Sequence, residues 1–349
     1  MKKILIRADG SKDIGMGHLS RCCLIANYLF AEKNIQSIII IRNDIAAKNF
    51  ISNKCKAVII HYIDNNLPHK DELACISAIV SKESILLILL DLLETNLTDQ
   101  YISGLYENNI PVSAIIDDSE RRIIDVDLIL NGNPNQDRFD YGEERGEYLL
   151  GASYFIMDPS YADNSIISKT PGSRILLTLG GSDHNNLIFG VLDVLVNISS
   201  VSEVVILTSK STGYSDELSK FVNDQSKKIR LYIDVPTLQP YWSECDLAIT
   251  AGGNTLFERI ASGVPGASIC QLPRQMEIAD KFEVMGVNRN IGYGPEIESD
   301  ILMKSINDFI TDDSSHLKQQ QKCREIITGS GIKLFSNELI KLVGDSNEL

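Results

Sequence analysis

A glycine-rich loop near the N-terminus carries the residue types best suited to chemistry. It contains Gly15, Gly17 and His18 and lies between an apolar strand pattern and an apolar helix pattern. Ligands of open α/β sheets bind where the strands end, so the loop has the position of a binding site. Gly15 and Gly17 carry no side chain and therefore let a ligand approach the backbone closely.

His18 is the candidate general base of this loop. We expect it at a helix N-terminus, where unpaired N–H groups and the helix dipole disfavour imidazolium, so that a neutral ring can accept a proton. Asp13 is close enough in sequence to orient His18 or to bind a sugar hydroxyl. Arg21 follows one helical turn later and could contact a phosphate. On pattern alone, His18 could also be a helix cap and Arg21 a solvated charge.

Two further glycine-rich turns follow strand patterns in the second half and precede helix patterns. A helix start with close backbone approach suits a phosphate or diphosphate. An asparagine after two glycines could equally be a plain helix cap. The residues of these turns are Gly181, Ser182, Gly252, Gly253, Asn254 and Thr255.

Single polar residues near these turns complete the candidate site. Glu258, one turn into its helix, could accept two hydrogen bonds from ribose hydroxyls or could be an ordinary first-turn glutamate. Gln275 could face the same ligand or cap its own helix. Asp91 and the segment 116–118 end strands of the first half, where acidic residues suit sugar contacts or turns.

Several reaction types find no motif. The chain has no Walker sequence, no GxGxxG, no GxSxG and no HExxH, and its five histidines lack metal-ligand spacing. We therefore expect no metal and no cofactor.

The elements that position these residues alternate between strands and helices, which predicts an α/β fold with parallel sheets. Helix patterns cover 186–198, 255–261 and 332–342. The predicted strands are 3–7, 37–41, 57–63, 85–90, 111–116, 127–130, 174–179, 204–208, 230–235, 247–250 and 267–272.

The chain is long enough for two domains. It has 349 residues, and periodicity fades around two prolines and a glycine near 159–172. We predict an N-terminal Rossmann-like domain over 1–165, a nucleotide-binding domain over 172–330, and a closing helix and tail over 331–349. Two such sheets in tandem predict a cleft between the domains.

Composition excludes other classes. With 33 Lys and Arg against 47 Asp and Glu, the net charge is −14, which disfavours nucleic acid and anionic membranes as partners. No apolar run approaches the ~20 residues that cross a bilayer. Seven cysteines without paired spacing predict reduced thiols and a cytoplasmic protein. The oligomeric state is not indicated.

The motifs together resemble those of a known family, the UDP-sugar hydrolases of pseudaminic acid biosynthesis, and of related glycosyltransferases of spore-coat polysaccharide synthesis. The resemblance covers most of the chain. The matching segments are 6–22, 116–118, 179–187 and 251–258. His184 and Asn254 stand where the commoner family form has proline and serine.

The resemblance implies a GT-B-like fold with two Rossmann-like domains, the second of which binds UDP. By that resemblance the turn at 252–255 would hold UDP, Glu258 the ribose, Gly181 and Ser182 the diphosphate, and Gln275 would face the sugar. The implied reaction is hydrolysis of a UDP-linked 2,4-diacetamido-2,4,6-trideoxyhexose by water that His18 activates. The alternatives are an inverting glycosyltransferase, in which His18 deprotonates an acceptor hydroxyl, and a nucleotide-sugar-binding module without turnover.

Overall fold

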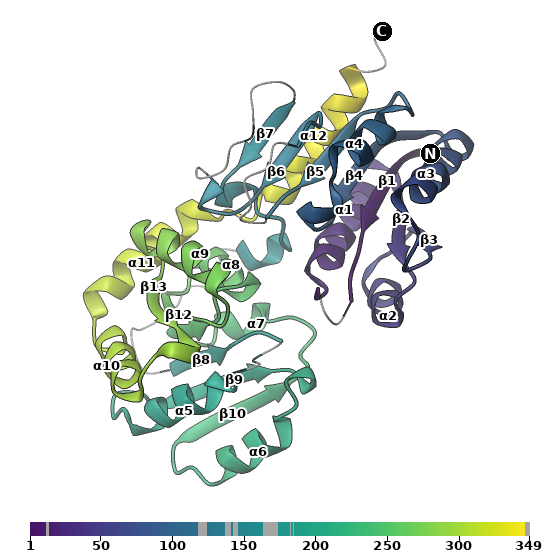
Figure 1. Ribbon diagram of the computed structural model, residues 1–349. Helices are drawn as coiled ribbons and strands as arrows, with labels where there is room; N and C mark the ends of the chain where they lie inside the picture. The colour runs from purple at the N-terminus through teal and green to yellow at the C-terminus, as the bar shows by residue number, and fades with distance from the viewer. Residues whose placement is uncertain are drawn as a thin grey trace. The chain divides into compact units, whose positions relative to one another are not determined.

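The chain forms two compact units, each built around its own sheet (Figure 1). The computed structural model describes residues 1–11, 14–117, 124–136, 141, 146–162, 174–181, 183 and 185–345. The first unit comprises Met1–Asp158 and Ser330–Leu349, and the second comprises Pro159–Gly329. All strand pairs that the structure describes are parallel, as the sequence predicts.

The sheet of the first unit has seven strands in the order β3-β2-β1-β4-β5-β6-β7. The strands are β1 (Lys2–Ala8), β2 (Ile35–Arg42), β3 (Ile59–Ile63), β4 (Ile85–Asp91), β5 (Val112–Ile115), β6 (Leu128–Asn131) and β7 (Glu147–Leu150). The helices of this unit are α1 (Gly17–Lys33), α2 (Ile45–Lys54), α3 (His69–Glu83), α4 (Asp99–Tyr106) and α12 (Gly331–Asp345).

Helices cover both faces of this sheet. Residues of α1, α2 and α12 share one hydrophobic core with Ile6 of β1, whereas residues of α3 and α4 share a second core with Leu5. Central strands are thus buried on both sides, which explains the continuous apolar runs of β4 and of the middle of β1 and β2, at 85–90, 4–6 and 38–41. The sequence analysis missed β7, a four-residue edge strand with one buried side chain.

The sheet of the second unit has six strands in the order β10-β9-β8-β11-β12-β13. The strands are β8 (Arg174–Thr178), β9 (Glu203–Thr208), β10 (Lys228–Ile233), β11 (Leu247–Thr250), β12 (Gly266–Cys270) and β13 (Arg289–Tyr293). The helices are α5 (Leu187–Asn197), α6 (Ser215–Asn223), α7 (Gln239–Trp242), α8 (Asn254–Ala261), α9 (Pro273–Val284), α10 (Ser299–Ile310) and α11 (Asp313–Ile326). In this sheet the sequence analysis missed β13, which is also an edge strand and has no buried side chain.

The C-terminal helix α12 belongs to the first unit, although the chain reaches it from the second. Its residues Ile332, Phe335 and Leu339 lie in the same core as residues of α1 and β1. The chain therefore passes between the units twice, at Asp158 and at Gly329. Membership of α12 is decided by which core its apolar stripe enters, which periodicity alone does not reveal.

Two cysteines differ from the expectation of reduced thiols. Cys23 of α1 and Cys55, the residue after α2, form a disulfide with a Cα–Cα distance of 5.0 Å. This distance lies in the ordinary range for disulfides, but a sequence separation of 32 gives no spacing signal. The prediction was wrong for this pair because packing of α1 against α2 brings them together.

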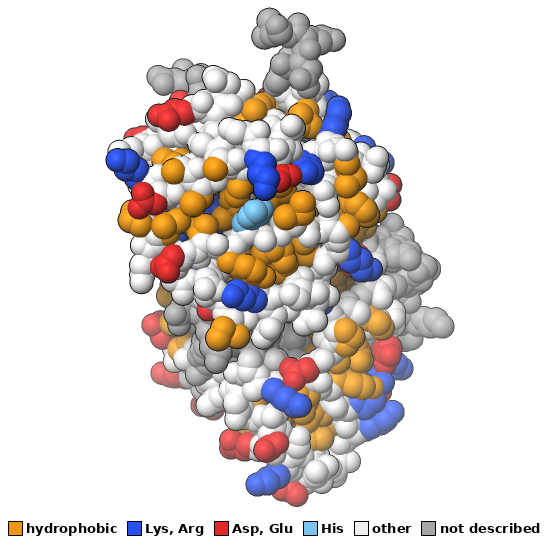
Figure 2. Space-filling model, turned by 90° about the vertical axis from the view of Figure 1, so that its right-hand side faces the viewer, with side chains coloured by type: hydrophobic (Ala, Val, Ile, Leu, Met, Phe, Trp, Pro, Cys, Tyr) orange, Lys and Arg blue, Asp and Glu red, His pale blue; other side chains and the backbone are white. Residues whose placement is uncertain are grey.

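The described surface is mixed in charge. On the described residues of the face in Figure 2, lysine and arginine side chains are interspersed with acidic, hydrophobic and uncharged ones. Within the described ranges, no helix has the length and apolar character that crossing a bilayer requires. The same residues contain no group of three or more His, Cys, Asp and Glu side chains arranged to hold a metal ion.

Candidate functional site

The first candidate site lies at the carboxyl ends of β1 and β4. In this sheet the connection after β1 leads to β2 on one side, whereas the connection after β4 leads to β5 on the other side. The point between β1 and β4 is therefore the topological switch point, where ligands of open α/β folds bind. The loop after β1 leads to His18 at the start of α1, and Asp91 is the last residue of β4. Sheet pairing sets Asp91 beside Ala8.

His18 and Asp91 form a hydrogen-bonded dyad. The Nδ1 of His18 lies 2.7 Å from Oδ1 of Asp91, whose side chain is fully buried. An ionised carboxylate only accepts hydrogen bonds, so Asp91 requires the proton on Nδ1 and fixes the tautomer in which Nε2 is unprotonated and can act as a base. His18 is not a helix cap, because Met16 is the N-cap residue of α1 and no side chain caps this end.

Asp13 lies outside the described residues, so its predicted role stays untested. The carboxylate that orients His18 in the structure is Asp91, 73 positions away in sequence. The strand-end pattern had left Asp91 open between a sugar contact and a turn residue. Only the adjacency of β1 and β4 identifies it as the partner of His18.

Arg21 binds the carboxylate of the dyad through its guanidinium. Its guanidinium makes hydrogen bonds of 2.9 and 2.7 Å to the two oxygens of Asp91 and two bonds of 3.1 Å to Asp117. The thiol of Cys22 lies 3.4 Å from Asp91 Oδ2. In this arrangement the guanidinium of Arg21 donates its hydrogen bonds to two carboxylates, Asp91 and Asp117, and not toward a phosphate site. Arg21 thereby positions Asp91.

These contacts change the protonation of His18. Burial lowers the pKa of His18, but the hydrogen bond to Asp91 and the charges of Asp91 and Asp117 outweigh it, so the pKa is raised from 6.5. Burial likewise disfavours charge on Asp91, yet Arg21 and His18 hold the pKa of Asp91 well below its usual range. The expectation that the helix N-terminus keeps His18 neutral is therefore corrected, because a buried carboxylate 2.7 Å away is the stronger influence.

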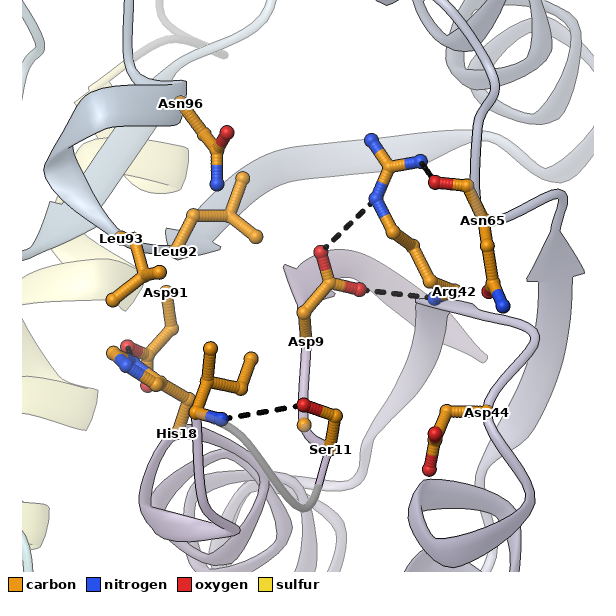
Figure 3. Close-up of a pocket in the computed structure, with 12 residues that line it drawn as sticks. Asp9, Ser11, His18, Arg42, Asp44, Asn65, Asp91, Leu92, Leu93 and Asn96 are labelled. Atoms are coloured by element: carbon orange, nitrogen blue, oxygen red, sulfur yellow. Dashed lines mark hydrogen bonds and ion pairs between the residues drawn. The ribbon is translucent and has the colours of Figure 1, made fainter.

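A pocket of about 350 Å³ opens beside the dyad (Figure 3). His18, Asp91 and Leu92 lie on one side of it, and Arg42 and Asn65 lie on the other. The lining residues all belong to the first unit; they are Asp9, Gly10, Ser11, Ile14, His18, Arg42, Asp44, Asn65, Asp91, Leu92, Leu93 and Asn96. The sequence analysis did not single out the far side of this pocket.

A buried ionic network fixes that far side. Asp9 accepts hydrogen bonds of 2.7 and 2.8 Å from Arg7 and one of 2.9 Å from the backbone N–H of Arg42. Glu72 accepts two further hydrogen bonds of 2.7 Å, one from Arg7 and one from the hydroxyl of Tyr101. The Nη2 of Arg42 lies 3.3 Å from Glu72. Charged groups on β1, β2 and α3 thus neutralise one another and hold the Arg42 side chain in place.

The second candidate site lies in the second unit, at the carboxyl ends of β8, β11 and β12, three neighbouring strands. Gly252 sits where the turn after β11 meets α9, since a Cβ there would lie 2.8 Å from Cβ of Gln275. Gly253 is the N-cap of α8, and no side chain caps this helix. Asn254 is therefore the first helical residue rather than the cap, and with Thr255 it begins a helix whose end is unblocked by a side chain.

Side chains tie these three turns together. Gln271 donates to the carbonyl of Leu179 at 2.6 Å, and the amide oxygen of Gln275 accepts from the backbone of Gln271 at 2.8 Å. Gly181 borders open space, because a Cβ there would meet nothing within 4 Å. Glu258 is half-buried one turn into α8. Ser182 lies outside the described residues.

The structure thus brings the predicted residues together in two groups. His18, Gly15, Gly17 and Arg21 gather at the switch point of the first sheet, and the glycine turns with Gln275 gather at the corresponding edge of the second. Gly15 has a φ of 79°, a backbone conformation that favours glycine. Asp117 belongs to the segment 116–118 that the sequence left open between a sugar contact and a turn, and the structure pairs it with Arg21. The residues that sequence reasoning missed are Arg42, Asn65 and Asn96; their only signal was a position at or after the end of a strand.

Comparisons with known proteins agree with this architecture. No family model matches the chain. It is 26% identical over 293 residues to an uncharacterized protein of Methanocaldococcus jannaschii, and 26% identical over 188 residues to spore coat polysaccharide biosynthesis protein SpsG of Bacillus subtilis. These matches cover 80% and 52% of this chain but 58% and 55% of the relatives, so the chain spans little more than half the length of either.

Solved structures share the fold over nearly the whole chain. MurG of Acinetobacter baumannii superposes with a TM-score of 0.70 at 12% identity, covering 98% of this chain and all of that one. Glycosyltransferase VinC, solved in complex with DTDP, gives a TM-score of 0.64 at 14% identity and covers 98% of this chain and all of that one. The fold is therefore that of the GT-B glycosyltransferases, two parallel-sheet Rossmann-like units, as the motif resemblance implies.

Proposed function

We propose that the protein is a nucleotide-sugar-dependent enzyme that transfers a glycosyl group from a UDP-sugar to a hydroxyl, with inversion at the anomeric carbon. The observation that carries the proposal is the His18–Asp91 dyad at the switch point of the first sheet. A buried carboxylate that fixes one ring nitrogen and leaves the other as an acceptor is the arrangement of a general base.

The second unit supplies the donor site in this proposal. The uncapped start of α8, with Gly252 and Gly253 before it, offers backbone N–H groups and a positive dipole end to a diphosphate. Gly181 on the neighbouring turn adds open backbone, and Glu258 and Gln275 are proposed for the ribose and the sugar. A diphosphate held in this way leaves as an anion without an added proton.

The reaction then needs one base. The acceptor oxygen attacks the anomeric carbon as the bond from that carbon to the β-phosphate oxygen breaks, and the bonding electrons leave with UDP. Nε2 of His18 takes the acceptor proton and later releases it to solvent. Asp91 stabilises the imidazolium that forms, because its charge lies 2.7 Å from Nδ1.

Hydrolysis is the second candidate, with water in place of the acceptor hydroxyl. The motifs around His18 resemble those of UDP-sugar hydrolases, which favours a UDP-linked 2,4-diacetamido-2,4,6-trideoxyhexose as donor and a place in pseudaminic acid synthesis. GT-B neighbours that are transferases, together with the relative named for polysaccharide synthesis, favour transfer.

One assay separates these functions. UDP release is measured from the UDP-linked diacetamido sugar and from UDP-N-acetylglucosamine, each with and without added monosaccharides, for wild type, His18→Asn and His61→Asn. His61 lies on the edge strand β3 and serves as the matched control. We expect acceptor-dependent release that falls about a hundredfold or more in His18→Asn only. Equal release without acceptor identifies a hydrolase, and UDP binding without any release refutes both enzymes.

A further inference from the structure

The pocket beside His18 is larger than the proposed base needs for water alone. A water molecule occupies about 30 Å³ in the liquid, whereas the pocket measures about 350 Å³. Its volume lies near the small end of ligand pockets, which span roughly 300 to 1,000 Å³. The space extends from His18 to Arg42 and Asn65, on the opposite side from the dyad (Figure 3).

The charges on the pocket favour an uncharged occupant. Asp9, Asp44 and Asp91 contribute carboxylates to the lining, and Arg42 contributes a guanidinium. The ion pairs behind the lining balance Asp9 and Glu72 with Arg7 and Arg42, and Arg21 balances one of the two carboxylates of Asp91 and Asp117, so the other carboxylate of that pair and Asp44 remain as net negative charge. The charge of Arg42 is already shared with Asp9 and Glu72, at 3.5 and 3.3 Å. An anionic group such as a phosphate would therefore enter a region of negative potential.

The remaining lining combines hydrogen-bonding groups with apolar side chains. Asn65 and Asn96 contribute amides, and Leu92 and Leu93 contribute an apolar side next to the dyad. Amide groups donate and accept hydrogen bonds, as sugar hydroxyls require. Leucine side chains suit the C–H faces of a sugar ring or the methyl of an acetamido group.

We infer that this pocket is the acceptor site and that it binds a neutral saccharide of about one sugar residue, with one hydroxyl presented to Nε2 of His18. The inference rests on the proposed transfer function. It adds that the acceptor group entering the pocket carries no phosphate and that Asn96, Asn65 and the Leu92–Leu93 pair select it.

The test measures the direct binding of sugars to the full chain, in the absence of any donor, by saturation-transfer NMR. Glucose and N-acetylglucosamine are the neutral probes, and glucose 6-phosphate is the anionic counterpart of nearly the same shape. Asn96→Trp fills the pocket, and Asn53→Trp on the exposed face of α2 controls for the added indole. UDP binding by calorimetry reports separately on the second unit.

We expect both neutral sugars to bind to wild type and to Asn53→Trp, glucose 6-phosphate to bind at least tenfold more weakly, and Asn96→Trp to lose sugar binding while it keeps UDP binding. The inference is overturned if no neutral sugar binds at about 20 mM, a concentration well above a weak Kd of roughly 1 mM. It is also overturned if the phosphate binds equally well or Asn96→Trp binds sugar normally. Because no turnover is involved, absence of UDP release would refute the proposed function without changing these outcomes.

Discussion

Replacing Asp91 by asparagine removes one negative charge from the centre of the dyad and keeps the shape of the side chain. Asp91 is fully buried and accepts hydrogen bonds from His18 and twice from Arg21. An asparagine amide that donates to Nδ1 of His18 would leave the ring proton on Nε2, which is the wrong nitrogen for a base. Arg21 keeps its two bonds to Asp117, so the buried guanidinium retains a carboxylate partner.

The size of the effect follows from the His18–Asp91 contact. A hydrogen bond to a charged group contributes about 1.5 to 3 kcal/mol. If that energy is realised when His18 becomes imidazolium in the transition state, its loss slows the reaction by roughly 10- to 150-fold, at 1.36 kcal/mol for each factor of ten. Tautomer inversion would add to this, so the estimate is a lower bound.

The pH dependence gives an independent sign. The base must be unprotonated to accept a proton. Burial lowers the pKa of His18, but Asp91 and Asp117 outweigh burial, so the pKa is raised from 6.5. Wild-type kcat should therefore increase with pH along an acid limb that lies above pH 6.5. Asp91→Asn removes the largest opposing charge, so its limb should move to lower pH while its plateau falls.

The assay is UDP release with acceptor from pH 5 to 9, for wild type, Asp91→Asn and Asp117→Asn. Asp117 acts on His18 through its charge but makes its hydrogen bonds to Arg21. Its variant should therefore shift the limb downward by less and keep its plateau within about threefold, because the hydrogen bond between His18 and Asp91 stays in place. Thermal unfolding shows whether each variant is folded. A folded Asp91→Asn enzyme with a wild-type plateau and limb would refute the reasoning.

Three further predictions concern stability and the donor site. The pKa of Glu72 is lowered because Arg7 and other partners outweigh its burial, so its contribution to stability is present above about pH 4.5 and is lost as pH falls through the lowered value. Urea unfolding should show a loss of about 3 kcal/mol at pH 7 in Glu72→Gln and a weaker fall of stability toward acid pH than in wild type, the remainder coming from carboxylates such as Asp91. Gly252→Ala should destabilise the chain by about 1 to 3 kcal/mol, because the added Cβ would lie 2.8 Å from Gln275 Cβ and α9 must move. Gly253→Ala should keep its stability, because the nearest atom to its Cβ lies at 3.5 Å, and it should weaken UDP binding in calorimetry. Equal stability loss in both variants would contradict the geometry. Cys55→Ser opens a loop of 32 residues and should cost about 3.7 kcal/mol in oxidising buffer; a reductant should destabilise wild type similarly and leave the variant unchanged.

The sequence alone determined the α/β class and most of the strands. Central strands such as β4 are buried on both faces, so their local composition is nearly all apolar and easy to recognise, and β1 carries the apolar run Ile4–Ile6 at its centre. The edge strands β7 and β13 were missed, because an edge strand buries few side chains and leaves a weak pattern. The glycine turns and His18 were found because each follows a strand and precedes a helix, a purely local relation.

Tertiary structure decided how those residues work. Asp91 is 73 positions from His18 and becomes its partner only because β4 pairs with β1, which sequence spacing does not encode. Non-local packing likewise places Arg21 within hydrogen-bond distance of Asp117 and allows the disulfide between Cys23 and Cys55. It also packs α12 in the core of the first unit. Local patterns name the groups that can do chemistry; the order of strands in the sheet determines which of them meet and which protonation state they hold.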